Sequence, residues 1–207
     1  MNIRVVENDA GFLSLKGAWA RLAEDHVPFQ KFDWVYRWWK YFKEDNNLKI
    51  LVAEENNEIV GIAPLYIKNV QIFKHLTIKK VSFLAEDISL YLDFMIQQNK
   101  DRESCFQTLF NYILHTLSFD ILELNDINSH FSNFDLWQKY VNSKNLNLTV
   151  FYKCPKIQLF KYKSYKDYFD QLSRKEKLSL KAAQNKIKKN NVIVEYLFKK
   201  RCKRRGY

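Results

Sequence analysis

Two side chains that could do chemistry, Tyr91 and Asp93, stand two positions apart in an otherwise apolar run. On a β-strand this spacing places both on one face, where Asp93 could act as a base or bind an amine. Trp34 lies off the apolar stripe of its expected helix and could stack on a sugar ring or an alkyl chain. The alternatives are a buried Tyr–Asp hydrogen bond and packing of Trp34 in the core. Trp34, Tyr91 and Asp93 are therefore candidate substrate-binding residues, and no catalytic residue is assigned.

Positive charge is concentrated toward the carboxy-terminal end of the chain. Residues 161–207 hold 16 Lys and Arg against 4 Asp and Glu, whereas residues 1–160 hold 18 against 19. Such a basic segment attracts nucleic acid or anionic surfaces, and we expect weak, non-specific nucleic-acid binding through it. The candidate anion-binding residues lie on a helix expected after the capping pair Ser173 and Glu176: Arg174, Lys175, Lys177 and Lys181. The alternative is a solvated amphipathic helix packed on the body.

Composition excludes several classes of protein. With four glycines in 207 residues, the chain cannot form a glycine-rich phosphate loop or a dinucleotide fingerprint. Its four histidines show no metal-ligand spacing, so no metal site is expected. Three widely separated cysteines favour a reducing compartment, and no apolar stretch approaches the ~20 residues of a membrane span. We therefore expect a cytoplasmic protein without a transmembrane segment.

Hydrophobic periodicity predicts an α/β domain. The first strand is expected near Ile3, followed by a helix capped by Asp9 and a second helix with an apolar stripe of Val35, Trp38, Trp39 and Phe42. Two strands flank Asn56-Asn57, which tolerate the positive φ of a hairpin turn, and Pro64 implies a sheet edge or a bulge. The remaining expected elements are strands at 76–84 and 91–96, a helix at 106–117, a strand at 120–124, a helix capped by Ser132 with Asp135, and strands at 146–152, 156–160 and 192–197.

Several short sequence words occur in a fixed order along the chain. They are Pro28-Phe29-Gln30, Trp34, Trp38-Trp39, Leu51-Val52-Ala53-Glu54, Ile59 to Leu65, Phe83-Leu84 and Tyr91-x-Asp93-Phe94. In this combination the chain resembles the amino-terminal half of the tandem GNAT acetyltransferases, which include CelD-like proteins of cellulose biosynthesis and are related to the Fem peptidyltransferases. The resemblance implies a GNAT-like mixed sheet with helices on both faces and central strands that splay apart to admit an acyl-coenzyme A.

The resemblance also implies a domain organisation and a function. Residues 1–162 would form the GNAT-like domain, and 163–207 would be a basic helix and the first strand of an incomplete second such domain. The implied activity is transfer of an acyl group from acetyl-coenzyme A or another acyl-coenzyme A to an amine or hydroxyl of a cell-envelope or polysaccharide-related acceptor.

Three departures from the family pattern point to a truncated, inactive chain that lacks the acyl-donor site. The second domain, where the family's donor site is expected, is incomplete. Residues 97–102 offer no glycine to cradle a pyrophosphate. Leu90 occupies a position that is often acidic in the family. The alternative is a non-catalytic binding module whose cationic tail meets an anionic partner or RNA.

Overall fold

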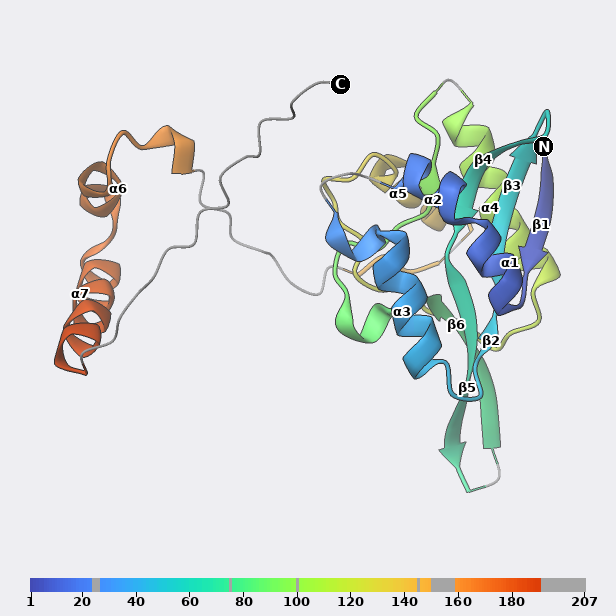
Figure 1. Ribbon diagram of the computed structural model, residues 1–207, viewed down its shortest axis with the longest axis horizontal. Helices are drawn as coiled ribbons and strands as arrows, with labels where there is room; N and C mark the ends of the chain where they lie inside the picture. The colour runs from blue at the N-terminus through green and yellow to red at the C-terminus, as the bar shows by residue number, and fades with distance from the viewer. Residues whose placement is uncertain (24–26, 75, 100, 145, 150–158, 191–207) are drawn as a thin grey trace, which may run out of the picture. The chain divides into compact units, whose positions relative to one another are not determined.

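The computed structural model describes residues 1–207 except 24–26, 75, 100, 145, 150–158 and 191–207 (Figure 1). The chain divides into two compact units, Met1–Thr149, called unit 1 below, and Val150–Tyr207, called unit 2. The domain boundary expected at residue 162, and the assignment of the following segment to a second GNAT-like domain, stay predictions.

Unit 1 is built around two four-stranded sheets, with strand orders β1-β3-β4-β7 and β2-β5-β6-β8. All pairings are antiparallel except that of β6 with β8, which is parallel. The strands are β1 (Asn2–Val6), β2 (Asn47–Leu48), β3 (Ile50–Glu55), β4 (Glu58–Ala63), β5 (Leu65–Phe73), β6 (Leu76–Phe83), β7 (Met95–Ile96) and β8 (Ile121–Leu122).

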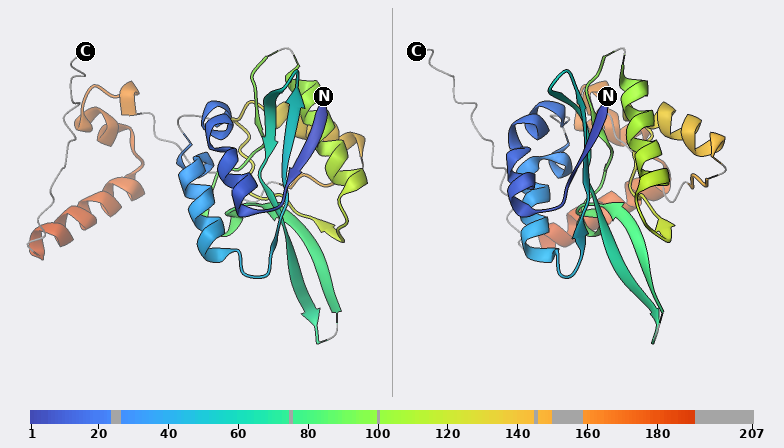
Figure 2. Two further views of the ribbon diagram at one scale, coloured as in Figure 1. Left: turned by 45° about the vertical axis from the view of Figure 1, so that its right-hand side comes forward. Right: turned by 90° about the vertical axis from the view of Figure 1, so that its right-hand side faces the viewer.

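Helices cover both faces of this layer of strands (Figure 2). One face carries α1 (Asp9–Ser14), α2 (Lys16–Leu22), η1 (Pro28–Gln30) and α3 (Phe32–Phe42), and the other carries α4 (Arg102–Thr116) and α5 (Phe134–Ser143). Strand β3 shows the division, because Ile50 and Val52 join the core with α1–α3 while Leu51 and Ala53 join the core with α4 and α5. The expected α/β class, a mixed sheet with helices on both faces, is confirmed.

The two sheets separate at Pro64. Strands β4 and β5 form one run that Pro64 interrupts, and the Pro64 carbonyl accepts a hydrogen bond from the Leu84 amide at 2.8 Å. Farther along the chain, residues 84–94 connect β6 to β7. Strand β6 pairs with β8 in one sheet, whereas β7 pairs with β4 in the other. In the described part of the chain, β7 and β8 share no ladder. The strands of the two sheets therefore separate at this point.

Local signals identified several elements correctly. Asn56 and Asn57 turn the β3–β4 hairpin with φ values of 50° and 65°. In α3, Val35, Trp38 and Trp39 are buried as expected, whereas Phe42 is 55% exposed because it lies on the last turn of the helix, beyond the sheet-facing stripe.

Other local expectations were wrong. The first helix is capped by Asn8, whose Oδ1 accepts from the Gly11 amide at 2.8 Å, because the Asp9 carboxylate binds Trp39 Nε1 instead. The strand expected at 91–96 is only Met95–Ile96, and Tyr91 at its expected start has a φ of 65°, which is not a strand conformation. Helix α5 begins after Asn133 without a side-chain cap, so the expected Ser132 cap does not form. Residues 146–149 are not a strand.

Unit 2 contains η3 (Leu159–Lys161), α6 (Tyr165–Gln171) and α7 (Arg174–Lys189). The predicted capping box is confirmed, because the Ser173 side chain accepts from the Glu176 amide while the Glu176 carboxylate accepts from the Ser173 amide. Residues 159–160, expected to end a strand, lie in η3. The expected strand segments at 150–152, 156–158 and 192–197 lie outside the described residues.

Candidate functional site

Residues 89–91, within the loop where the sheets separate, hold Trp34 at the molecular surface. Trp34 Nε1 donates a 2.8 Å hydrogen bond to Ser89 Oγ, and the Phe29 ring meets the indole edge-on with centroids 5.4 Å apart. Trp34 is 39% exposed, whereas the other four tryptophans are buried. A partly exposed tryptophan that is fixed through its Nε1 is suited to stack on a ligand.

Tyr91 is brought to the same place by Gln30. The buried Gln30 side chain donates through Nε2 to the Tyr91 carbonyl at 3.0 Å, while the Gln30 carbonyl accepts from Trp19 Nε1 at 2.8 Å. On its other side, the Tyr91 ring lies 6.0 Å from that of Phe131. The bonds from Trp34 to Ser89 and from Gln30 to Tyr91 thus join η1 and α3 to this loop, and the aromatic residues of these segments and of the neighbouring loop, Phe29, Trp34, Tyr91 and Phe131, are called the aromatic surface below.

The backbone around the aromatic surface is strained. Ala85, Tyr91 and Asp126 have φ values of 65°, 65° and 63°, in the region that favours glycine. Each such residue costs on the order of 1–3 kcal/mol and persists only where surrounding contacts hold it. The Leu92 amide, which follows Tyr91, donates to the Asp126 carbonyl at 3.1 Å and ties two of these turns together. The site is therefore held by its scaffold in a fixed shape.

Asp93 lies apart from this surface, in the interior. Asp93 is only 3% exposed. Its Oδ1 accepts hydrogen bonds from the Phe94 amide at 2.7 Å and from Trp137 Nε1 at 2.8 Å. Asn133 Nδ2 donates to the Phe94 carbonyl at 2.8 Å beside it. These contacts give Asp93 a structural role in fixing α5 against the strand run that ends in β7.

The start of α4 does not fit the pyrophosphate of an acyl-coenzyme A. Asp101 and Glu103 place negative charge there, and hydrogen bonds from Lys139 and Tyr140 lower the pKa of Glu103. The Arg102 guanidinium is already paired with Asp135 at 2.9 Å. An anion bound here would need the backbone amides of Asp101 and Arg102 as donors. Both amides already donate to Asn99, the first to its Oδ1 and the second to its carbonyl oxygen.

A partly buried lysine paired with two glutamates was not anticipated from the sequence. Lys80 Nζ lies 3.3 Å from Glu86 Oε1 and 3.0 Å from Glu123 Oε2. Burial raises the pKa of Glu86, opposed by its contacts with Ser82 and Lys80. The signal available in the sequence was the acidic pair Glu86-Asp87 directly after an apolar strand.

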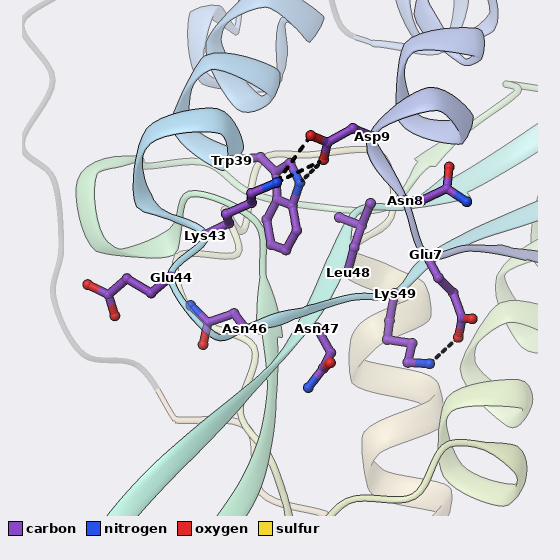
Figure 3. A pocket seen from close by; sticks show the side chains of 10 residues that line it. All are labelled: Glu7, Asn8, Asp9, Trp39, Lys43, Glu44, Asn46, Asn47, Leu48 and Lys49. Atoms are coloured by element: carbon purple, nitrogen blue, oxygen red, sulfur yellow. Dashed lines mark hydrogen bonds and ion pairs between the residues drawn. The ribbon is translucent and has the colours of Figure 1, made fainter.

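A polar pocket of about 580 Å³ lies where the β1–α1 junction meets the end of α3 (Figure 3). Trp39 Nε1 donates to Asp9 Oδ1 at 2.8 Å, Lys43 Nζ lies 3.1 Å from Asp9 Oδ2, and these bonds lower the pKa of Asp9. Lys49 pairs with Glu7 across the pocket. The two lysines of the pocket are therefore each paired with a carboxylate, and Glu44 adds a further negative charge to its lining.

The four predicted anion-binding residues of unit 2 lie at the start of α7. Lys177 and Lys181 sit over the Phe169 ring, with Nζ atoms 5.9 Å and 5.8 Å from its centroid. Lys177 also donates to the Asp170 carbonyl at 2.9 Å. Arg174 and Lys175 are exposed in the first turn. An anion-binding role for all four stays a prediction.

Two kinds of feature are missing from the described residues. They contain no group of three or more His, Cys, Asp and Glu that could hold a metal ion. None of the described helices combines the length and apolar character needed to cross a membrane.

Comparison with known proteins gives fold-level likeness only. No protein family matches the sequence, and no curated protein does. One similar solved structure is a ribosomal-protein-alanine N-acetyltransferase from Brucella melitensis biovar Abortus 2308, with 12% identity and a TM-score of 0.40 over 76% of this chain and 99% of that one. Another is an integron cassette protein from the mobile metagenome of V. cholerae, with 13% identity and a TM-score of 0.41 over 78% of this chain and 97% of that one.

Proposed function

We propose that unit 1 is a GNAT-like domain of an acyltransferase and that it recognises the acyl acceptor, an amine- or hydroxyl-bearing, polysaccharide-related molecule of the cell envelope. The observation that carries the proposal is the exposed Trp34, fixed to Ser89 at the place where the two sheets separate. Sugar rings and alkyl chains are the groups that an exposed indole face binds by stacking. The sequence words that resemble the tandem GNAT acetyltransferases include Trp34, Tyr91 and Asp93 themselves.

The acyl donor would be held away from the start of α4, because the carboxylates there repel phosphate and the one nearby arginine is already paired. Acyl transfer requires the donor and the acceptor to be held close together in the correct orientation. A domain that binds only the acceptor would therefore catalyse the reaction slowly. The same misfit favours the second candidate function, a binding module that recognises the same acceptor without catalysing transfer.

Tryptophan fluorescence tests the acceptor proposal, since Trp34 is the exposed indole of the chain. Cellohexaose and the hexamer of β-1,4-linked glucosamine are the probes. We expect one of them to shift the emission saturably, and calorimetry with the same probe to show that Trp34→Ala abolishes binding. Tyr41→Ala is the matched control, because Tyr41 lies on the same helix and is 79% exposed. Equal binding by wild type and Trp34→Ala, or no binding of either probe, would refute acceptor recognition by this surface.

Calorimetry with acetyl-coenzyme A separates the donor question from the acceptor question. At about 150 mM salt, where the Debye length is about 8 Å, non-specific attraction to the basic segment is screened. We expect no saturable micromolar binding. Saturable binding that Arg102→Ala weakened, with Lys175→Ala as control, would place the donor at α4 and overturn the division of roles.

A further inference from the structure

We infer that the β5–β6 hairpin binds the surface of an anionic lipid bilayer by inserting its tip. Beyond residues 66–67 and 80–81, where β2 and β8 pair with it, the described hairpin continues as a two-stranded ribbon that projects from the body of unit 1 (Figures 1 and 2). An isolated pair of strands is marginally stable in water and presents two open edges. We therefore expect the projecting ribbon to be stabilised by binding to another surface.

Exposed apolar side chains stand on both sides of Lys74 at the end of the hairpin. Phe73 is 71% exposed, Ile72 and Leu76 are also exposed, and Phe73 is paired directly with Leu76. Farther along the ribbon, Val70 is paired with Ile78, which adds a second apolar pair behind the tip. Exposed apolar residues gathered at the end of a projection are costly in water, and burial in the acyl region of a bilayer removes that cost.

Positive charge surrounds the tip. Residues 65–83 contain four lysines and no Asp or Glu. Lys80 is paired with Glu86 and Glu123, whereas Lys68, Lys74 and Lys79, called the lysine collar below, form no ion pair with any residue that the structure describes. At ~3.3 Å per residue, Lys68 and Lys79 stand about 10–16 Å from the tip. Segments that lie in the interface insert about 5–10 Å, which would leave Lys68 and Lys79 level with the lipid phosphates, while the long Lys74 side chain would reach back to them from the tip.

Charge decides between possible occupants. A second copy of the chain would bring another lysine collar against this one, and like charges repel. Nucleic acid would satisfy the lysines but leave Ile72, Phe73 and Leu76 in water. An anionic bilayer satisfies both features, with acyl chains for the tip and phosphates for the lysine collar.

Flotation of the full chain with phosphatidylcholine vesicles, with and without 30 mol% phosphatidylglycerol (an illustrative composition of about one third anionic lipid), tests the inference. We expect binding only to the anionic vesicles. Phe73→Ser should weaken it about tenfold or more, and Lys74→Glu with Lys79→Glu by a similar factor. Tyr41→Ser, an exposed aromatic on α3, is the control for the tip, and Arg174→Glu with Lys175→Glu measures the contribution of unit 2.

A second measurement reports insertion itself. In a Trp34→Phe background, Phe73→Trp places an exposed indole at the tip, and Tyr41→Trp places one elsewhere. We expect the tip indole to shift to the blue and to be quenched by brominated lipid, and the control indole to be unaffected. Absence of vesicle binding, binding without a change at position 73, or a change of oligomeric state in Phe73→Ser without any loss of vesicle binding would each overturn the inference.

Discussion

Helix α4 packs closely on the sheet at Gly61, and this contact supports a double-mutant prediction. Gly61 lies in β4 opposite Ala53 and Ile96. A Cβ built on Gly61 would overlap Cys105 Sγ and lie 3.3 Å from Leu109 Cδ1. The methyl group of Gly61→Ala must therefore push α4 away from the strand or force the Cys105 side chain out of place.

The magnitudes follow from packing. Overpacking of a core costs about 1–3 kcal/mol, and the lower entropy of the unfolded alanine chain returns about 0.4–1 kcal/mol. Gly61→Ala should therefore lower the free energy of unfolding by about 1–2 kcal/mol. Cys105→Ala alone removes a buried sulfur and should cost about 1 kcal/mol. In the double variant the new methyl group occupies the space of the lost sulfur, so the combined loss should be smaller than the sum by about 1–2 kcal/mol.

Urea unfolding followed by tryptophan fluorescence measures this coupling, because all five tryptophans lie in unit 1. Gly17→Ala serves as the control, since an added Cβ there would meet no atom within 4 Å. That variant should be stabilised by about 0.5–1 kcal/mol, as expected for alanine in a helix. Strictly additive losses in the Gly61 and Cys105 variants would show that the two residues are not packed as described.

Three further predictions concern the core and its titrating groups. Trp39→Ala should lose about 3–5 kcal/mol of stability in urea, and an intact transition midpoint would contradict its burial. The Asp9 pKa is lowered by Trp39 and Lys43, so its stabilising contribution is present above the unfolded pKa of about 3.9 and is lost as the pH falls through the folded pKa. Acid titration of Asp9→Asn should therefore show a shallower loss of stability below about pH 4 than wild type does. Burial raises the pKa of the Cys105 thiol to about 12, so Cys105 should resist iodoacetamide in the folded chain at pH 8 and react only after unfolding, which mass spectrometry of the labelled peptide would show.

Elements with strong local signals could be predicted from the sequence. The Asn56-Asn57 turn and the Ser173 capping box each depend on a few neighbouring residues, and both are as expected. The expectations that failed depended on distant partners. Asp9 does not cap the first helix because Trp39, 30 positions away, donates to its carboxylate. Tyr91 leaves the strand conformation, and the contact that fixes its carbonyl comes from Gln30.

The candidate site was only partly predictable for the same reason. Residue type singled out Trp34 and Tyr91, but the bonds that join their segments, from Trp34 to Ser89 and from Gln30 to Tyr91, span 55 and 61 positions. Neither separation leaves a periodic trace in the sequence. The expectation that Asp93 shares a face with Tyr91 required a regular strand, which the positive φ of Tyr91 interrupts.

The position of the candidate site follows from how the strands are buried. Because β3 and β4 pack helices on both faces, their side chains are committed to the two cores and leave little that a ligand can reach. This layering is interrupted at Pro64 and residues 84–94, where the sheets separate. The strained turns at Ala85 and Tyr91 lie on this loop, and contacts from Gln30 and Asp126 hold it in place. A rigid two-sided core thus supports a fixed loop, which is the arrangement that a binding surface requires.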